Sequence, residues 1–270
     1  MKIFDCFMFF NELDLLELRL MEVYDYVDYF VLVEGNKTHT GHPKEFIFEQ
    51  NKERYSKWLD KIIHVKIEDF PEYVLDRPAL LENFHRNQII RGLVGKVEVG
   101  DKIMVSDVDE IPNMEMIKPY FNQPGWFHFK CDLFYYYVNT QCDCGFGGVV
   151  MAEWKNFRNP QRLRMMAIRK QRWTEGSDNV FMHSGWHYSY LCGGDPERVM
   201  FKAKNIFEGH DSAPIVGTTE EVTDKIKNHK DLYNRRTPRY HQTVVDISNN
   251  KPKHLDEWLK KYPEYYYHEK

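Results

Sequence analysis

The residues of this chain best suited to chemistry are three carboxylates that follow an apolar run. Residues 103–105 (Ile-Met-Val) are expected to end a buried strand, and Asp107, Asp109 and Glu110 follow shortly after it. Residues two apart on an extended chain point to the same side, so Asp107 and Asp109 are placed to hold one hard cation. Mg²⁺ and Mn²⁺ prefer oxygen ligands and usually share them with substrate phosphates. The segment therefore predicts a metal site that binds a diphosphate.

A plainer interpretation of the same acids stays open at this point. Asp-x-Asp occurs by chance in many chains, and acidic residues collect in loops and at helix starts. Glu110 either supports the metal ligands or caps the turn before Pro112. The choice depends on whether the rest of the chain supplies a nucleotide site.

The N-terminal part of the chain alternates between predicted strands and helices. Strands are expected over 3–10, 29–33, 46–48, 62–67 and 102–106, and helices over 49–61, over 77–93 and from Asn11 as N-cap. This alternation predicts an α/β fold with a parallel sheet, in which ligands bind beyond the carboxyl ends of the strands. Three polar groups follow such strand ends and are expected to converge: Asn11 with Glu12, Glu34, and the acids of 107–110.

The pattern changes after residue 120. Longer aromatic strands are expected over 126–138, 147–154 and 179–191, and helices over 158–172 and 196–207. The basic residues of 158–172 are interpreted as a solvated helix face or as a contact to an anionic acceptor. We predict one domain over 1–270, with a nucleotide-binding half at about 1–112, an acceptor-side half at about 113–215, and a helical tail at about 216–270.

Composition argues against several classes of partner. A formal net charge of -4 gives no general attraction to nucleic acid or to anionic lipid. No apolar stretch approaches the roughly 18 residues of a membrane span, and the N-terminus reaches acidic residues before a signal-peptide core is complete. The five cysteines are scattered and odd in number, so we expect reduced thiols. These features predict a cytoplasmic protein without a membrane span.

Four blocks of the sequence resemble glycosyltransferase family 17. They are FDCFMFFNELDLLELRL (residues 4–20), VDYFVLVE (27–34) with THTG (38–41) and PK (43–44), SDVDEIP (106–112) and GWHYS (185–189). With weaker similarity between them, the blocks cover about residues 3–210. The resemblance implies a GT-A fold, in which a mostly parallel central sheet forms an α/β/α sandwich that binds a nucleotide-sugar.

The resemblance also implies an activity. It points to an inverting, metal-dependent glycosyltransferase that moves GlcNAc from UDP-GlcNAc to a carbohydrate acceptor, with Mn²⁺ or Mg²⁺ as cofactor. The identity of the acceptor is not carried over from the family. The alternatives are the same fold acting on another UDP-hexose, or an inactive carbohydrate-binding relative. A metal-dependent phosphohydrolase would want more His and Asp ligands than the neighbouring strand ends provide.

The resemblance assigns roles to particular residues. Asp107 and Asp109 would bind the metal, with His187 or His210 as a further ligand. Glu197, ahead of Asp195, would be the catalytic base, although acids beside a Pro at a helix start are also an ordinary N-terminus. The residues expected to contact the nucleotide-sugar are Asn11, Glu12, Glu34, Lys44, Arg86, Asn87, Asp107, Trp186 and Lys202.

These candidates have structural alternatives. Glu34 would also fit as a solvated acid in a turn, and Arg86 would also fit in a surface ion pair. Lys44 would fit an exposed loop, and Trp186 would fit the core rather than a sugar face.

Overall fold

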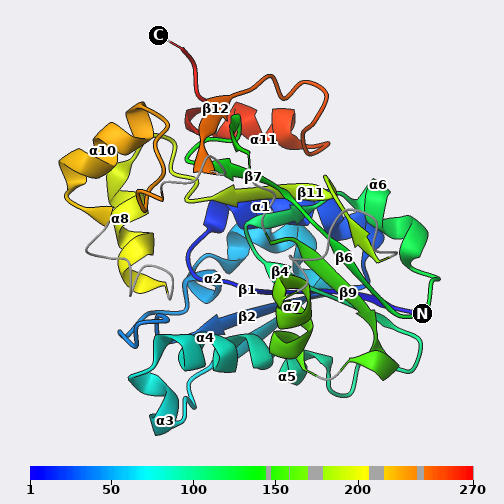
Figure 1. Ribbon diagram of the computed structural model, residues 1–270. Coiled ribbons are helices and arrows are strands. Elements are labelled where there is room, and N and C mark those ends of the chain that lie inside the picture. The colour runs from blue at the N-terminus through cyan, green and yellow to red at the C-terminus, as the bar shows by residue number, and fades with distance from the viewer. Residues whose placement is uncertain (144–146, 158, 170–178, 207–215, 236–239, 270) are drawn as a thin grey trace.

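The structure, a computed structural model shown in Figure 1, has an α/β fold. It describes residues 1–143, 147–157, 159–169, 179–206, 216–235 and 240–269. The predicted α/β class is confirmed, because parallel strands joined by helices form the centre of the molecule.

Seven strands of the described residues form the larger sheet, in the order β10-β6-β9-β4-β1-β2-β3. Their bounds are Ile3–Met8 (β1), Tyr29–Gly35 (β2), Ile62–Ile67 (β3), Lys102–Asp107 (β4), Trp126–Phe129 (β6), Val149–Glu153 (β9) and Val180–Phe181 (β10). Strands β4, β1, β2 and β3 run parallel, whereas β9 is antiparallel to both β4 and β6. The parallel arrangement predicted for the N-terminal strands is therefore confirmed.

Helices cover both faces of this sheet (Figure 1). Leu16 and Leu20 of α1 pack with Phe7 and its neighbours on one face, while Ile89 of α5 and Leu163 of α7 pack on the other. Side chains alternate between the faces along each strand, so each strand serves two cores. The α-helices among the described residues are α1 (Leu13–Val23), α2 (Ile47–Gln50), α3 (Glu72–Leu75), α4 (Pro78–Asn87), α5 (Ile89–Leu93), α6 (Met114–Ile117), α7 (Pro160–Arg169), α8 (Pro196–Asn205), α10 (Thr219–Lys227) and α11 (Leu255–Lys261).

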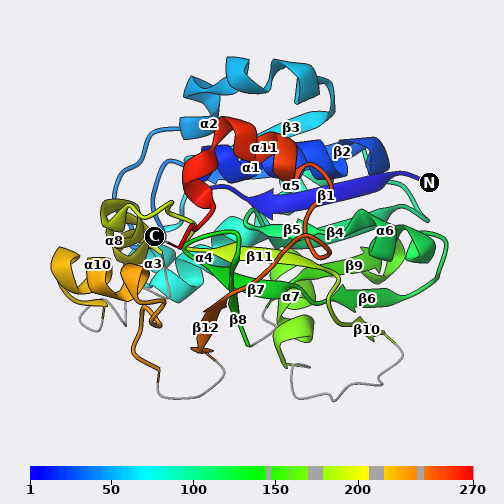
Figure 2. The ribbon, with the colours of Figure 1, turned by 90° about the horizontal axis from the view of Figure 1, so that it is seen from above.

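A second sheet lies on the far side of α1. Its strands, in the order β12-β8-β7-β11-β5 among the described residues, are Gln242–Val244, Thr140–Cys142, Asp132–Tyr135, Gly185–Ser189 and Glu110–Pro112. Helix α1 packs between the sheets, because Leu16 faces the larger one and Leu15 and Leu18 face the smaller one (Figure 1). Helix α11 lies over α1 in the view from above (Figure 2). Of the strands of this second sheet, β7 and β11 fall within predicted strands, whereas β5, β8 and β12 were not predicted.

Two predicted strands are each broken into two. The segment 126–138 divides into β6 and β7, and 179–191 divides into β10 and β11. In both cases the first piece belongs to the larger sheet and the second to the smaller, where β7 and β11 pair in parallel. The second break includes His183, whose φ of 55° is incompatible with a strand. Within each of these two segments the chain therefore passes from the larger sheet to the smaller one.

Other local predictions need correction. Residues 46–48 do not form a strand, because α2 begins at Ile47. Asn11 is not the cap of α1, whose N-cap position is Glu12 without a side-chain cap bond. Residues 77–93 divide into α4 and α5, and β12 appears in the tail that was expected to be helical.

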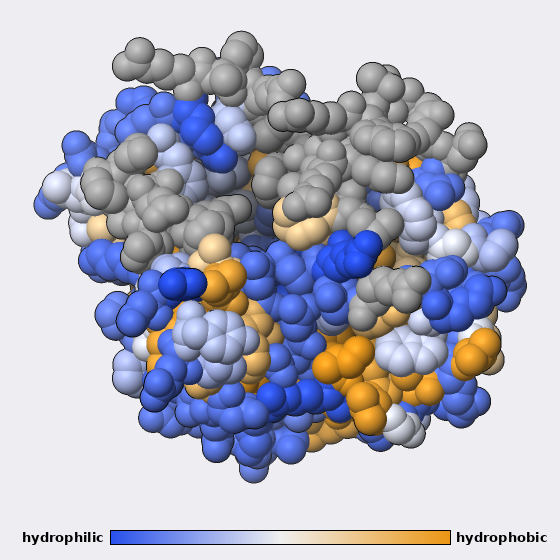
Figure 3. Space-filling model, turned by 60° about the horizontal axis from the view of Figure 1, so that its bottom comes forward, coloured by the Kyte–Doolittle hydropathy of each residue, from blue (hydrophilic) through white to orange (hydrophobic). Residues whose placement is uncertain are grey.

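The surface carries separate exposed hydrophobic residues within a mainly hydrophilic face (Figure 3). Tyr73, Val94 and Val99 are the most exposed of the large hydrophobic side chains described beyond the first residue. Scattered residues of this kind are normal for a globular protein. No helix within the described ranges is long and apolar enough to cross a membrane.

Candidate active site

A cavity of about 570 Å³ opens at the carboxyl ends of β1 and β4. One side is built by α4 and α7, and the other by β7, β11 and α8, so both halves of the chain contribute. Of the residues proposed from sequence, five line it together with Asp107: Glu12, Arg86, Asp109, His187 and Lys202. The structure thus brings the strand-end acids of β1 and β4 together.

The turn after β4 is held by a buried arginine. Strand β4 ends at Asp107, and the chain enters β5 of the second sheet at Glu110, so Asp109 lies in the turn between the strands. Arg19 of α1 donates to the backbone carbonyls of Asp107 (3.0 Å) and Glu110 (2.8 Å). Its guanidinium also pairs with Asp5 at 2.6 Å, and both side chains are fully buried. Arg19 therefore fixes the backbone that carries the acids.

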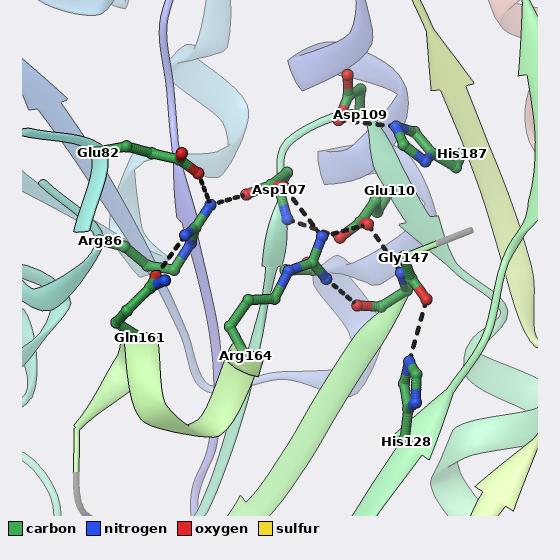
Figure 4. Close-up of polar contacts among 12 residues, drawn as sticks. Glu82, Arg86, Asp107, Asp109, Glu110, His128, Gly147, Gln161, Arg164 and His187 are labelled. Atoms are coloured by element: carbon green, nitrogen blue, oxygen red, sulfur yellow. Dashed lines mark hydrogen bonds and ion pairs between the residues drawn. The ribbon is translucent and has the colours of Figure 1, made fainter. Parts of the chain in front are cut away.

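Asp107 is clamped by two arginines (Figure 4). Arg86 of α4 lies 3.1 Å from its Oδ1, and Arg164 of α7 lies 3.0 Å from its Oδ2. Burial raises the pKa of Asp107, but the positive charges of Arg164 and Arg86 lower it by more than burial raises it. The carboxylate therefore stays ionised. Arg86 also pairs with Glu82 at 2.7 Å, which ties α4 to the same network.

Glu110 is a buried support of this turn. Its carboxylate accepts from the backbone N–H of Asp107 (2.9 Å) and Gly148 (2.8 Å), and pairs with Arg164 at 2.6 Å. Gly147 has a φ of 66°, and a Cβ there would lie 1.9 Å from Glu110 Oε1, so only glycine fits. Glu110 therefore does both things that were expected of it. It supports the acids through Arg164, and it caps the turn through the N–H of Asp107.

Asp109 faces a different set of partners. Lys202 of α8 lies 2.9 Å from its Oδ2 and 3.1 Å from Glu12, and so links α8 to the start of α1. His187 of β11 places Nε2 3.7 Å from Oδ1 of Asp109. Burial raises the pKa of Asp109, but Lys202 and His187 lower it more, while the two acids raise the pKa of Lys202. Asp109 and Lys202 are therefore both charged at neutral pH.

The donor atoms around Asp109 fit a divalent cation that is also bound by its substrate. No group of three or more His, Cys, Asp or Glu ligands was found within the described residues. Asp109 Oδ1 and His187 Nε2 nevertheless face one another at 3.7 Å. Adjacent ligands of an octahedral ion at about 2.1 Å lie about 3.0 Å apart, so both side chains would bind one ion after a small shift towards each other. Such an ion completes its coordination with phosphate and water.

The charges of the ion-paired side chains around Asp107 and Asp109 also favour a bound cation. The carboxylates exceed the permanent cations by two, since Arg86, Arg164 and Lys202 face Glu12, Glu82, Asp107, Asp109 and Glu110.

Glu34 and Lys44 lie outside the lining of the cavity. Met8 of β1 is paired in register with both Val33 and Asp107, so Glu34 is one residue beyond the row of Asp107 and points to the opposite face. There its carboxylate binds Lys44 at 2.7 Å and accepts from the backbone N–H groups that begin α2. The contacts that Glu34 makes in this structure are therefore structural, and its nucleotide contact stays a prediction.

Three further nucleotide candidates also lie outside the cavity lining. Trp186 is buried in the core between the second sheet and α11, and donates to Asn250. Asn87 accepts from the backbone N–H of Gln161 at 3.0 Å and so joins α4 to α7. Asn11 is likewise absent from the residues that line the cavity.

The two candidate bases lie at the outer end of α8. Asp195 is the N-cap of the helix and accepts from the backbone N–H of Glu197 at 2.9 Å. Glu197 is exposed and accepts from the hydroxyl of Thr219 at 3.1 Å. Neither lines the cavity, because α8 directs Lys202, near its other end, towards the acids. His210 lies outside the described residues.

Sequence reasoning missed several residues of the site. Arg164 was included in a basic run interpreted as solvated or acceptor-binding, yet its side chain is buried against two acids. Arg19 had a usable signal, because it falls three residues after Leu16 and four before Val23, within the apolar stripe of α1. No sequence signal of this kind marks His85, Tyr135 or the other cavity residues from later elements.

An α/β sheet with a parallel centre, a second sheet and an acid-rich cavity at the strand ends is compatible with a GT-A-like fold. The chain belongs to glycosyltransferase family 17, whose family model matches residues 1–241.

Curated relatives have the same protein name in three mammals. The proteins from Homo sapiens, Rattus norvegicus and Mus musculus named beta-1,4-mannosyl-glycoprotein 4-beta-N-acetylglucosaminyltransferase are each 24% identical over 243 residues. The match covers 79% of this chain and 44% of each relative, so the chain spans less than half of their length.

Proposed function

We propose that this protein is an inverting, metal-dependent glycosyltransferase that transfers GlcNAc from UDP-GlcNAc to a carbohydrate acceptor. The observation that carries the proposal is the combination of ionised acids and buried cations in one cavity, at the strand ends of a family 17 chain. The names of the mammalian relatives support GlcNAc as the transferred sugar.

The residues of the cavity have complementary tasks in this reaction. Asp109 and His187, with Asp107 beside them, would hold Mn²⁺ or Mg²⁺, which would offset the charge that develops on the leaving diphosphate. Lys202 adds a buried positive charge on the same side of the cavity. Arg86 and Arg164 keep Asp107 ionised and in place, so the donor meets a preorganised site.

The general base of an inverting transfer must deprotonate the acceptor hydroxyl from within the cavity. Asp195 and Glu197 do not meet this condition, because they lie outside its lining. Glu12 and Glu82 are lining carboxylates outside the turn of residues 107–110. We place the base in this pair.

Calorimetric titration with UDP-GlcNAc, UDP-glucose, UDP-galactose and GDP-mannose, each with and without Mn²⁺, tests the proposal. We expect Mn²⁺-dependent binding of UDP-sugars with UDP-GlcNAc preferred, and release of UDP when a glycan acceptor is added. Preference for another UDP-hexose would retain the class of reaction and change the donor. A lack of metal-dependent binding of any nucleotide would contradict the proposal.

A further inference from the structure

Helix α4 buries nitrogen atoms in the cavity wall without a hydrogen-bond partner in the described parts of the chain. They are Nδ1 and Nε2 of His85 and Nε of Arg86, and each of the two residues is 4% exposed. Buried polar atoms without a partner are few in native proteins and are unfavourable. Two adjacent residues with this deficit at one cavity indicate that a polar ligand completes their hydrogen bonding.

The ring of His85 is neutral. Burial, together with the neighbouring His39, lowers its pKa well below the ordinary value. A neutral imidazole offers one donor and one acceptor. The Val33 backbone acts in the opposite direction on the ring and favours a proton on the nearer nitrogen, which leaves the other nitrogen as an acceptor. His85 is therefore suited to a neutral ligand group that donates a hydrogen bond.

The position of His85 relates this group to the acids. Arg86, the next residue of α4, contacts Asp107 at 3.1 Å, so His85 stands beside the charged part of the cavity. His39 also lines the cavity, with its ring edge-on to His85 at 5.6 Å between centroids. A donor whose diphosphate lies at the acids would extend its nucleoside along α4 to these two rings.

We propose that His85, with His39 beside it, recognises the nucleobase of the donor. This inference rests on the proposed function and names residues that select the nucleotide. Uracil carries a hydrogen on N3 that the acceptor nitrogen of His85 can receive, whereas cytosine carries none at that position. A site built around a buried hydrogen-bonding group rejects a near-isosteric ligand that leaves the group unpaired. His85 therefore distinguishes UDP from CDP.

Calorimetry with UDP, CDP and inorganic pyrophosphate, all with Mn²⁺, tests the inference on the full chain. The variants are His85→Phe and His85→Gln, with His42→Phe as a matched control at an exposed histidine of the loop between β2 and α2. We expect the wild type and the control to prefer UDP over CDP. Both His85 variants should lose UDP affinity on the order of tenfold and lose that preference, with pyrophosphate binding unchanged.

A thermal melt of the ligand-free protein separates recognition from structure. Phe fills the same space without buried polar nitrogens, so the Tm of His85→Phe should equal or exceed that of the wild type. Wild-type UDP affinity and preference in both His85 variants would overturn the inference while the proposed function stands. Equal weakening of all three ligands, or a lower Tm in both variants, would show a structural role and also overturn it. A wild type that binds no nucleotide would contradict the proposed function itself.

Discussion

Glu34 and Asp107 make an informative comparison, because both are acids near the carboxyl ends of parallel strands. Asp107 faces α4 and α7, where Arg86 and Arg164 hold it in the wall of the cavity. Glu34 is one residue further along in register and faces α2, where it is buried among Lys44 and backbone N–H groups. Since side chains alternate across a sheet, one step in register separates a residue of the site from a residue of the scaffold.

The largest effect is expected on the cavity side of this comparison, from Asp109→Asn. The change removes the charge that faces Lys202 and His187 and that would bind the cation. Transfer should fall on the order of a thousandfold, with Mn²⁺-dependent UDP binding lost and the fold retained. Asp256→Asn, at an exposed acid of α11, is the control. Tight Mn²⁺-dependent binding in the Asp109 variant would remove this residue from the metal site.

Arg164→Met tests whether the clamp on Asp107 matters for the reaction. The variant leaves Asp107 and Glu110 without a shared buried partner, so the turn should shift. We expect transfer to fall about a hundredfold by displacement of the acids, and the free energy of unfolding to fall by about 3–5 kcal/mol. Arg162→Met, at an exposed position of the same helix, should change neither quantity. Normal turnover in Arg164→Met would show that the clamp serves stability alone.

Glu34→Gln tests the scaffold side. The variant keeps the shape but weakens the contacts to Lys44 and to the start of α2, so we expect a loss of about 1–3 kcal/mol in the free energy of unfolding. The KM for the UDP-sugar and the kcat of the folded fraction should stay close to wild type, as in the exposed control Glu45→Gln. A raised KM with unchanged stability would return Glu34 to the nucleotide site.

Glu17 extends the comparison to an acid that joins α1 to the C-terminal helix, and its effect should be the smallest. Burial raises its pKa, but Lys261, Tyr262 and Arg54 lower it more, so the folded pKa lies below 4.5. A carboxylate whose pKa is lower in the folded protein stabilises the fold at pH values above its ordinary pKa. This stabilisation is lost as the pH falls through the pKa of the folded protein. The Tm of Glu17→Gln should therefore lie below wild type at pH 7, and the difference should close as the pH falls through the folded pKa of Glu17, below 4.5. A constant difference at all pH values would contradict this account.

The sequence by itself determined the elements whose signals are local. The apolar residues of β1 to β4 form short runs, interrupted by Asp5 in β1 and by His64 and Lys66 in β3. The parallel sheet and the acids after β4 were therefore predicted close to their observed bounds. The segments that resemble family 17 also carried the family assignment, which the family model confirms over residues 1–241.

Only the tertiary structure decided which acids share a cavity. Arg164 and Lys202 follow Asp107 and Asp109 by 57 and 93 residues, and nothing local marks them as partners. The direction of α8 placed Lys202 inside and Glu197 outside, and the register of β2 turned Glu34 away. The physical reason is the same in each case: strand and helix formation follow from neighbouring residues, whereas the face that a polar side chain meets depends on long-range register and packing.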